Sequence, residues 1–240
     1  MHAVGDDRPL LGVTFDSCLS MKHAVYELAG VGHSRVTAIL RLRRFHSIAS
    51  VVGFYKAQVL GKLEFATPAI YHATDFILAA LDRVQDRFLD AVGLSQVSAL
   101  LEFKLAPLRS RRDIALLGFL HRIVLGKAPK QFSDIVHFAS CPGFPRSFRD
   151  PARLHDRQLR DPFCGSESRM LQRSWLRLIY TYNLLPQAVV DHTSVSAFQK
   201  QLQIAVQNAA RSEMSSWSSI LRDGVRLMSV SSFQALFQDR

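Results

Sequence analysis

Helical periodicity of the apolar residues constrains the fold of this chain more than any other feature. The clearest case covers residues 77–92, where apolar side chains recur at spacings of four, three, four and four. Such spacing places them on one face of an amphipathic helix. Thr74 can cap the start of this helix, and Gly93 can end it. The pattern therefore predicts a helix whose apolar face is buried in a core.

The same periodicity predicts a mainly α fold with one short N-terminal strand. Strand-like alternation occurs clearly only in residues 11–15, where Leu11, Val13 and Phe15 alternate with Gly12 and Thr14. Gly30 and Gly32 predict a weak point or break in the first helix. The further helices are predicted at residues 20–45, 48–64, 96–105, 109–125, 171–182 and 195–214.

Changes in composition predict how the chain is divided. Residues 1–17 are expected to form a leader and the strand, and residues 18–137 a helical domain. Prolines and glycines gather after residue 138, so residues 138–168 are predicted to form an irregular linker. Residues 169–240 are predicted to form a C-terminal helical extension.

Composition excludes several classes of protein. Hydrophobic residues make up 48% of the chain, which is too many for a disordered tail. Three scattered cysteines do not form a disulfide framework, and acidic residues precede the first apolar run, unlike in a signal peptide. Charged residues interrupt the most apolar stretch, residues 48–70. We therefore expect an intracellular protein with no membrane partner.

Positive charge is concentrated in two windows. Residues 35–62 hold six basic residues and no acidic one, and residues 104–130 hold seven basic residues and only Asp113 as an acid. Guanidinium groups form forked hydrogen bonds with phosphate oxygens, so these windows favour a nucleic-acid backbone as partner. The alternative is that both windows are merely solvated helix faces. The residues predicted to contact phosphates are Arg41, Arg43, Arg44, Lys56, Lys62, Arg109, Arg111 and Arg112.

Six short segments, in order, resemble a known family. Residues 11–16, LGVTFD, resemble a strand that closes the palm of reverse transcriptases of non-LTR retrotransposons, of the jockey or LINE-like kind. Residues 19–44 are similar to the long first thumb helix with its basic end. The other segments are LEFATPA (63–69), LDRVQDRF (81–88), LAPL followed by Arg111 and Arg112 (105–112), and YNLLP followed by Phe198 and Leu202 (182–202). Phe65, Ile70–Tyr71 and Tyr182 depart from the family pattern and suggest a divergent copy.

The resemblance implies a helical thumb-like bundle that grips a template–primer duplex. It also implies that the catalytic aspartates of the polymerase lie upstream of the strand, where this sequence has only ten residues. Gly5-Asp6-Asp7 is interpreted as a chance match to a polymerase motif. We therefore expect no catalytic residues, no enzymatic activity and no cofactor. The expected partner is an RNA–DNA or DNA duplex.

Other interpretations stay open. A zinc site could use His137, Cys141, His155 and Cys164, but their spacing matches no common zinc motif, and no metal site is predicted. The chain could instead be a helical protein–protein interaction module, with a protein partner at the surface that would face the palm. It could also be a non-functional relic of a decayed mobile element.

Overall fold

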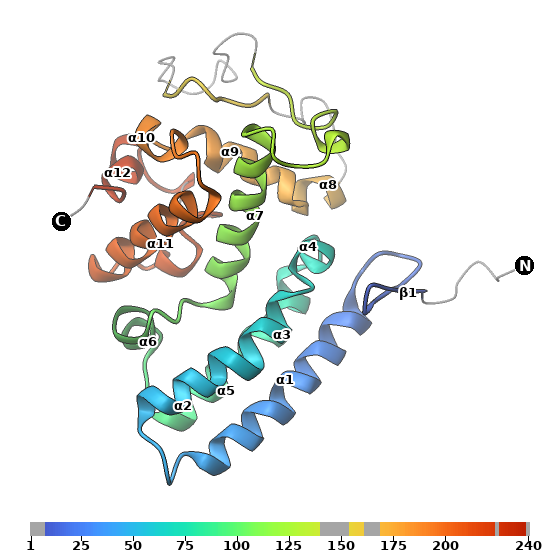
Figure 1. The fold of residues 1–240 in the computed structure, drawn as a ribbon, viewed down its shortest axis with the longest axis vertical. Helices are drawn as coiled ribbons and strands as arrows, with labels where there is room; N and C mark the ends of the chain where they lie inside the picture. The colour runs from blue at the N-terminus through green and yellow to red at the C-terminus, as the bar shows by residue number, and fades with distance from the viewer. Residues whose placement is uncertain (1–7, 140–153, 161–168, 224–225, 239–240) are drawn as a thin grey trace, which may run out of the picture. The chain divides into compact units, whose positions relative to one another are not determined.

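The structure is a computed structural model, and it describes residues 8–139, 154–160, 169–223 and 226–238 (Figure 1). The described residues form a mainly α fold with one two-stranded sheet, which confirms the fold class expected from the helical periodicity. Most of the predicted linker lies outside the described residues. The elements are β1 (Arg8–Leu10), β2 (Val13–Phe15), α1 (Lys22–Leu42), α2 (Ile48–Tyr55), a π-helical segment (Lys56–Leu60), α3 (Gly61–Glu64), α4 (Thr67–Ile70), α5 (Asp75–Val92), α6 (Gln96–Phe103), α7 (Leu108–Val124), α8 (Arg169–Arg173), α9 (Leu178–Asn183), α10 (Gln187–Val190), α11 (Val195–Arg211) and α12 (Val230–Ala235).

The chain separates into two compact units. Unit 1 comprises residues 1–112 and 173–175, and unit 2 comprises residues 113–172 and 176–240. The division falls within α7, whereas the sequence pattern placed a domain boundary at about residue 138. Each unit is considered by itself below.

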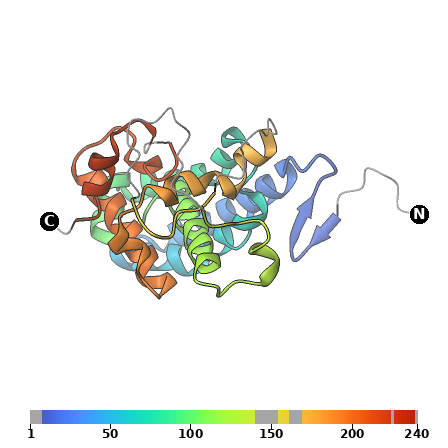
Figure 2. The ribbon, with the colours of Figure 1, turned by 90° about the horizontal axis from the view of Figure 1, so that it is seen from above.

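The N-terminal strand of unit 1 has a partner that the sequence pattern did not reveal. Strand β2 pairs antiparallel with β1, with Leu10 opposite Val13 (Figure 2). Leu11 and Gly12 form the turn, with φ angles of 51° and 79°. Two successive positive φ values are what a tight hairpin turn of the primed type requires. Val13 is buried in the core, so β2 is part of unit 1 and not a loose edge.

Helix α1 begins at Lys22 because Asp16 holds the preceding turn. The Asp16 carboxylate accepts hydrogen bonds from the backbone N–H groups of Cys18, Ser20 and Met21. Slight desolvation raises the pKa of Asp16, but these bonds and one from the Ser20 hydroxyl outweigh it and lower the pKa. The aspartate that completes the LGVTFD segment therefore has a structural role: it joins the hairpin to the first helix.

The expected break at Gly30 and Gly32 does not occur, because α1 is continuous through both. A Cβ atom built on Gly32 would lie 3.0 Å from side-chain atoms of Leu63 and of Val84. Glycine at this position thus lets α3 and α5 approach α1 closely. The predicted break is absent because tertiary packing outweighs the low intrinsic helix propensity of glycine.

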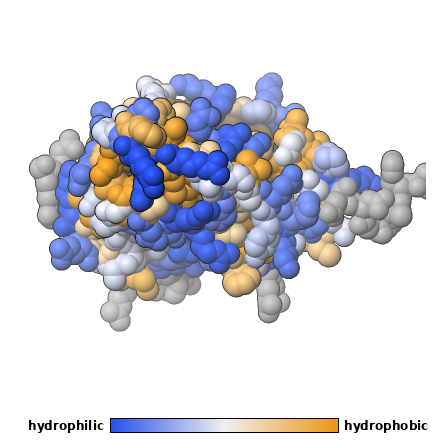
Figure 3. Space-filling view, turned by 90° about the horizontal axis from the view of Figure 1, so that it is seen from below, coloured by the Kyte–Doolittle hydropathy of each residue, from blue (hydrophilic) through white to orange (hydrophobic). Residues whose placement is uncertain are grey.

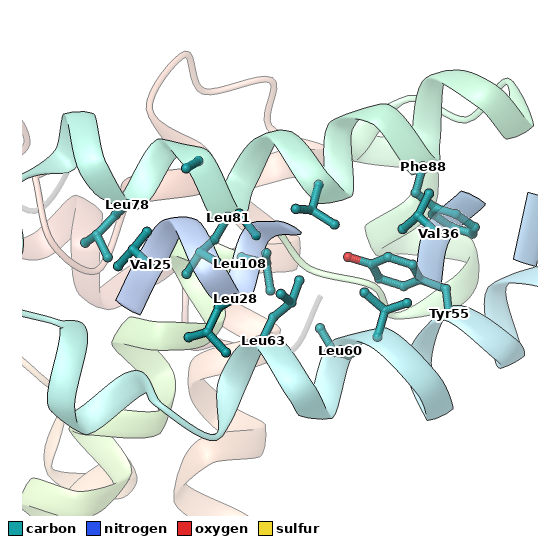
Figure 4. Close-up of a cluster of buried hydrophobic side chains, with 14 of the residues drawn as sticks. Val25, Leu28, Val36, Tyr55, Leu60, Leu63, Leu78, Leu81, Phe88 and Leu108 are labelled. Atoms are coloured by element: carbon teal, nitrogen blue, oxygen red, sulfur yellow. The ribbon is translucent and has the colours of Figure 1, made fainter. Parts of the chain in front are cut away.

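Helices α1 and α5 pack against each other. They run in the same direction, because Thr37 of α1 meets Arg87 of α5, and Arg43, just after α1, meets Ala91 near the end of α5. Figure 4 shows side chains of both helices meeting those of the α2–α3 segment.

Thr74 caps α5 by accepting a hydrogen bond from the N–H of Ile77, and Gly93 ends it with a φ of 73°, which confirms both predicted caps. The α2–α3 segment is helical from Ile48 to Glu64, as expected, but contains a π-helical segment. There the Arg35 guanidinium donates to the carbonyl of Gln58.

The core of unit 1 contains a buried aromatic stack with an unsatisfied hydroxyl. The rings of Tyr55 and Phe88 stack with centroids 4.3 Å apart (Figure 4). Burial raises the pKa of Tyr55, with a further contribution from the nearby Glu64 carboxylate. The Tyr55 hydroxyl has no hydrogen-bond partner among the described residues. It therefore carries a desolvation cost that no contact offsets.

Replacing Tyr55 by phenylalanine is expected to raise the free energy of unfolding of unit 1 by about 1 kcal/mol. The ring stack is retained, and only the unsatisfied hydroxyl is removed. Hydrogen exchange of the α5 amides in the whole chain measures this change. Tyr182→Phe is the contrasting variant in unit 2, read through the α11 amides, and should be destabilising there, because the Tyr182 hydroxyl lies 3.0 Å from Nδ1 of His121. A loss of stability in Tyr55→Phe would show that its hydroxyl has a partner.

Candidate nucleic-acid interface

Three arginines of the second basic window, at the start of α7, are paired with carboxylates within unit 1. Arg109 lies 3.6 Å from Asp75, and Arg112 lies 2.9 Å from Asp82 with only 4% of its side chain exposed. Arg111 forms a forked ion pair with Glu64, in which Nη2 lies 3.1 Å from Oε2. These pairs tie the start of α7 to α3 and α5. They leave little unneutralised charge here for a phosphate.

The arginines of the first window are exposed. Arg41, Arg43 and Arg44, called the loop arginines below, lie at the end of α1 and in the loop that leads to α2. Arg43 donates to the carbonyl of Ala91, near the C-terminus of α5. A carbonyl does not cancel the charge of a guanidinium, and no carboxylate among the described residues forms an ion pair with the loop arginines. They are therefore the strongest of the predicted contacts.

Apolar side chains accompany the loop arginines. Phe45 is 80% exposed, and Leu42 and Ile48 are exposed as well. Figure 3 looks onto the end of unit 1 that carries this loop, where hydrophilic and hydrophobic residues lie side by side. The surface thus offers both charge and apolar area to a partner.

The two predicted lysines are engaged locally. Lys56 is half-buried and donates to the carbonyl of Phe103, at the end of α6. Burial lowers the pKa of Lys56, as do the nearby charges of Arg111 and Lys104. The Lys62 ammonium lies over the ring of Phe65, 4.6 Å from its centroid. Neither lysine lies in the exposed loop that the loop arginines occupy.

A second group of basic residues was missed by the sequence prediction. Arg83 and Arg87 are exposed on α5, and Arg87 meets Thr37 and His33 of α1. We call these four residues the seam cluster, because they lie where the two parallel helices meet; the two arginines are exposed, and His33 and Thr37 are half-buried. The spacing of four between the arginines was the only signal in the sequence, since it places both on one face of a helix.

Unit 2 contains a buried polar cluster around Tyr182. Nε2 of His121 lies 2.7 Å from the carbonyl of His192, and Nδ1 lies 3.0 Å from the Tyr182 hydroxyl. Because a carbonyl only accepts, Nε2 carries the proton and Nδ1 accepts from Tyr182. Burial lowers the pKa of His121, although the bond to His192 opposes this effect. Both nitrogens are thus engaged, and the cluster leaves His121 no free nitrogen for a ligand.

His155 is engaged in the same way. Its Nε2 donates to the carbonyl of Tyr182, and its Nδ1 accepts from the N–H of Arg157. His137 is exposed, whereas Cys141 and Cys164 lie outside the described residues. Among the residues that the structure describes, no group of three or more histidine, cysteine or acidic side chains is arranged to hold a metal ion.

Comparison with known proteins finds no matching family model, no matching curated protein and no matching solved structure. The resemblance to reverse transcriptases thus rests on the sequence segments alone. None of the helices in the described parts of the chain combines the length and the apolarity that a membrane span needs.

Proposed function

We propose that unit 1 binds the phosphate backbone of a nucleic-acid duplex, as the thumb of a retrotransposon reverse transcriptase would. The observation that carries this proposal is the difference between the two basic windows. Arg109, Arg111 and Arg112 of the second window are paired with carboxylates, whereas the loop arginines are exposed and meet no carboxylate among the described residues. The proposal assigns binding to the chain and no catalytic step.

Binding through the backbone is electrostatic and does not depend on base sequence. Each phosphate that a cationic side chain neutralises releases a condensed counterion, so affinity falls as salt is added. Arg41 and Arg44 are the main contacts, because no hydrogen bond or ion pair holds either of them among the described residues. Arg43, fixed on the carbonyl of Ala91, contributes charge from a defined position.

Replacing both Arg41 and Arg44 by glutamine is expected to weaken binding to a short RNA–DNA hybrid by about tenfold or more. The slope of log K against log salt concentration should fall by about two, since two phosphate contacts are lost. Fluorescence anisotropy of a labelled hybrid across a salt series measures both quantities.

The matched control is Arg109→Gln together with Arg111→Gln. It removes the same charge from residues that are already paired with Asp75 and Glu64. It should change the affinity much less, provided that circular dichroism shows a folded chain. Wild-type binding that stays the same from low to moderate salt would contradict the proposal.

A second candidate function is docking of a protein partner, which the hairpin favours. Leu11 is 91% exposed and Leu10 is 60% exposed, so the tip of the hairpin is apolar. Leucine is also poorly suited to the positive φ of 51° that Leu11 adopts. An apolar side chain at such a position gains from burial against a partner. A chain that binds no nucleic acid even at low salt would favour this candidate.

A further inference from the structure

The seam cluster has a fixed internal geometry. Nη2 of Arg87 donates to the Thr37 hydroxyl oxygen at 3.1 Å, and this hydroxyl donates in turn to the carbonyl of His33 at 2.9 Å. The Thr37 hydroxyl hydrogen is therefore already used, and its oxygen is oriented to accept from Arg87. Thr37 is thus a positioning residue, which holds the guanidinium of Arg87 against α1.

His33 completes the cluster. Its Nδ1 lies 3.5 Å from Nη1 of Arg87. A guanidinium can only donate, so Nδ1 faces it as an acceptor, and the proton of the neutral ring sits on Nε2. Burial lowers the pKa of His33, and the charges of Arg87 and Arg83 lower it further. In the absence of a ligand, the ring is held neutral and can donate from Nε2.

The charged groups that face His33 are Arg83 and Arg87 of α5. Its neighbours one turn away on α1 are Ala29, Gly30, Val36 and Thr37, none of them charged. Leu63 is the α3 residue that meets α1 at the adjacent Gly32. Three acids flank the arginines in sequence. Asp82 pairs with Arg112, and Asp86 accepts from the side chain of Gln96. Asp90, three residues after Arg87, is exposed and forms no ion pair among the described residues.

No carboxylate among the described residues forms an ion pair with Arg83 or Arg87. The cluster therefore presents two exposed guanidinium groups beside the half-buried ring of His33, and no carboxylate among the described residues is ion-paired with them. A group with several negatively charged oxygens satisfies such donors best. Phosphate has this chemistry, and arginine binds it through forked hydrogen bonds.

We propose that Arg83, Arg87 and His33 form a phosphodiester-binding site on the seam between α1 and α5, with Thr37 positioning Arg87. This inference rests on the proposed function and extends it. His33 and Arg41 are eight residues apart on one helix, which corresponds to about 12 Å along its axis. Measured along the axis of a duplex, at about 3.4 Å per phosphate of one strand, this distance spans about three to four phosphates. One nucleic-acid strand can then lie along α1, from the seam cluster to the loop arginines.

The site has a measurable consequence for His33. A bound phosphate offsets the charges of the two arginines and favours the protonated ring. The pKa of His33 should therefore rise when nucleic acid binds. By linkage, the affinity should be higher at about pH 6 than at about pH 8.

The test is a pH titration of the His33 ring in the whole chain by NMR, alone, with inorganic phosphate and with a short oligonucleotide duplex. The pKa of His33 is expected to rise with the duplex. A rise with phosphate alone would show that the cluster also takes the free anion. Arg87→Gln should weaken duplex binding several-fold, reduce the salt slope by about one and abolish the rise.

Lys22→Gln is the matched control, because Lys22 is an exposed cation at the other end of α1. It should leave the His33 titration unchanged. If Arg87→Gln fails to fold, Arg83→Gln replaces it, since no ion pair in the described residues holds Arg83.

The outcomes separate the two proposals. In one outcome, binding depends on salt and is weakened by Arg41→Gln and Arg44→Gln, but the pKa of His33 does not change and Arg87→Gln has no effect. This outcome overturns the seam site and leaves the proposed function standing. No binding by the wild-type chain at low salt overturns the proposed function and, with it, the phosphodiester site. A rise in the His33 pKa with phosphate would then mark only a site for free anions.

Discussion

Replacing Arg112 by methionine is expected to lower the free energy of unfolding of unit 1 by about 2–3 kcal/mol and to leave nucleic-acid affinity nearly unchanged. Arg112 is 4% exposed and lies 2.9 Å from Asp82. Methionine replaces much of the alkyl chain but leaves the carboxylate without its cation. Water can reach Asp82, whose side chain is 31% exposed, so the loss falls below that of a fully buried pair. Hydrogen exchange of the α5 amides measures it.

Arg44→Met is the contrasting variant, because Arg44 is exposed. Its stability should change by no more than about 0.5 kcal/mol, whereas its affinity for the hybrid should fall. Combining Arg112→Met with Asp82→Asn should cost less than the sum of the two single changes, since the pair is lost only once. If Arg112→Met kept full stability but bound the hybrid much more weakly, Arg112 would belong to the binding surface.

The helices of unit 1 could be predicted because the signals that define them are local. Thr74 and Gly93 lie next to the helix that they cap, and the apolar spacing between them gives its buried face. Strand β1 of the hairpin was missed because Arg8–Leu10 is short and polar at its start. It pairs because Leu11 and Gly12 both adopt positive φ, which is not expected of a leucine.

The exposed cations of the proposed binding surface could be predicted only in part, because tertiary partners neutralise some of the charges. Arg111 and Glu64 are 47 residues apart in the sequence, and Arg112 and Asp82 are 30 apart. The charges counted along the chain therefore predicted that the basic side chains at the start of α7 are unpaired and available to a phosphate. The structure instead places a carboxylate against each of Arg109, Arg111 and Arg112.

The seam cluster was missed for the opposite reason: acidic residues nearby in the sequence do not neutralise its arginines in the structure. Asp82, Asp86 and Asp90 flank the two arginines of α5 in the sequence, so the linear charge of this segment is balanced. In the helix, Asp82 pairs with Arg112 and Asp86 accepts from Gln96, and the exposed Asp90 forms no ion pair with either arginine among the described residues. Arg83 and Arg87 are left on the other side, beside α1. Positive charge thus appears on a surface where the sequence shows none in excess.

The second large effect is expected in unit 2, where His121→Ala should lower the free energy of unfolding by about 3–4 kcal/mol. The His121 ring is fully buried and stacks on Phe198, with centroids 4.1 Å apart. Alanine leaves a cavity and removes the acceptor of the Tyr182 hydroxyl. Urea denaturation of the whole chain, followed through hydrogen exchange of the α11 amides, measures the loss. Stability equal to that of the wild type would show that the cluster does not hold unit 2 together.

The same histidine should make unit 2 sensitive to acid. Burial lowers the pKa of His121 in the folded chain below its ordinary value of 6.5, so the unfolded chain takes up a proton first. The contribution of the neutral ring to stability is therefore complete above about pH 6.5 and is lost as the pH falls toward the lowered pKa.

Lowering the pH from about 7.5 to about 5.5 should reduce the urea midpoint of the wild-type chain. The reduction should be smaller in His121→Ala, which no longer has this ring, and unchanged in His137→Gln, because His137 is exposed. An equal reduction in all three proteins would assign the acid sensitivity to other groups and would leave His121 with a packing role alone.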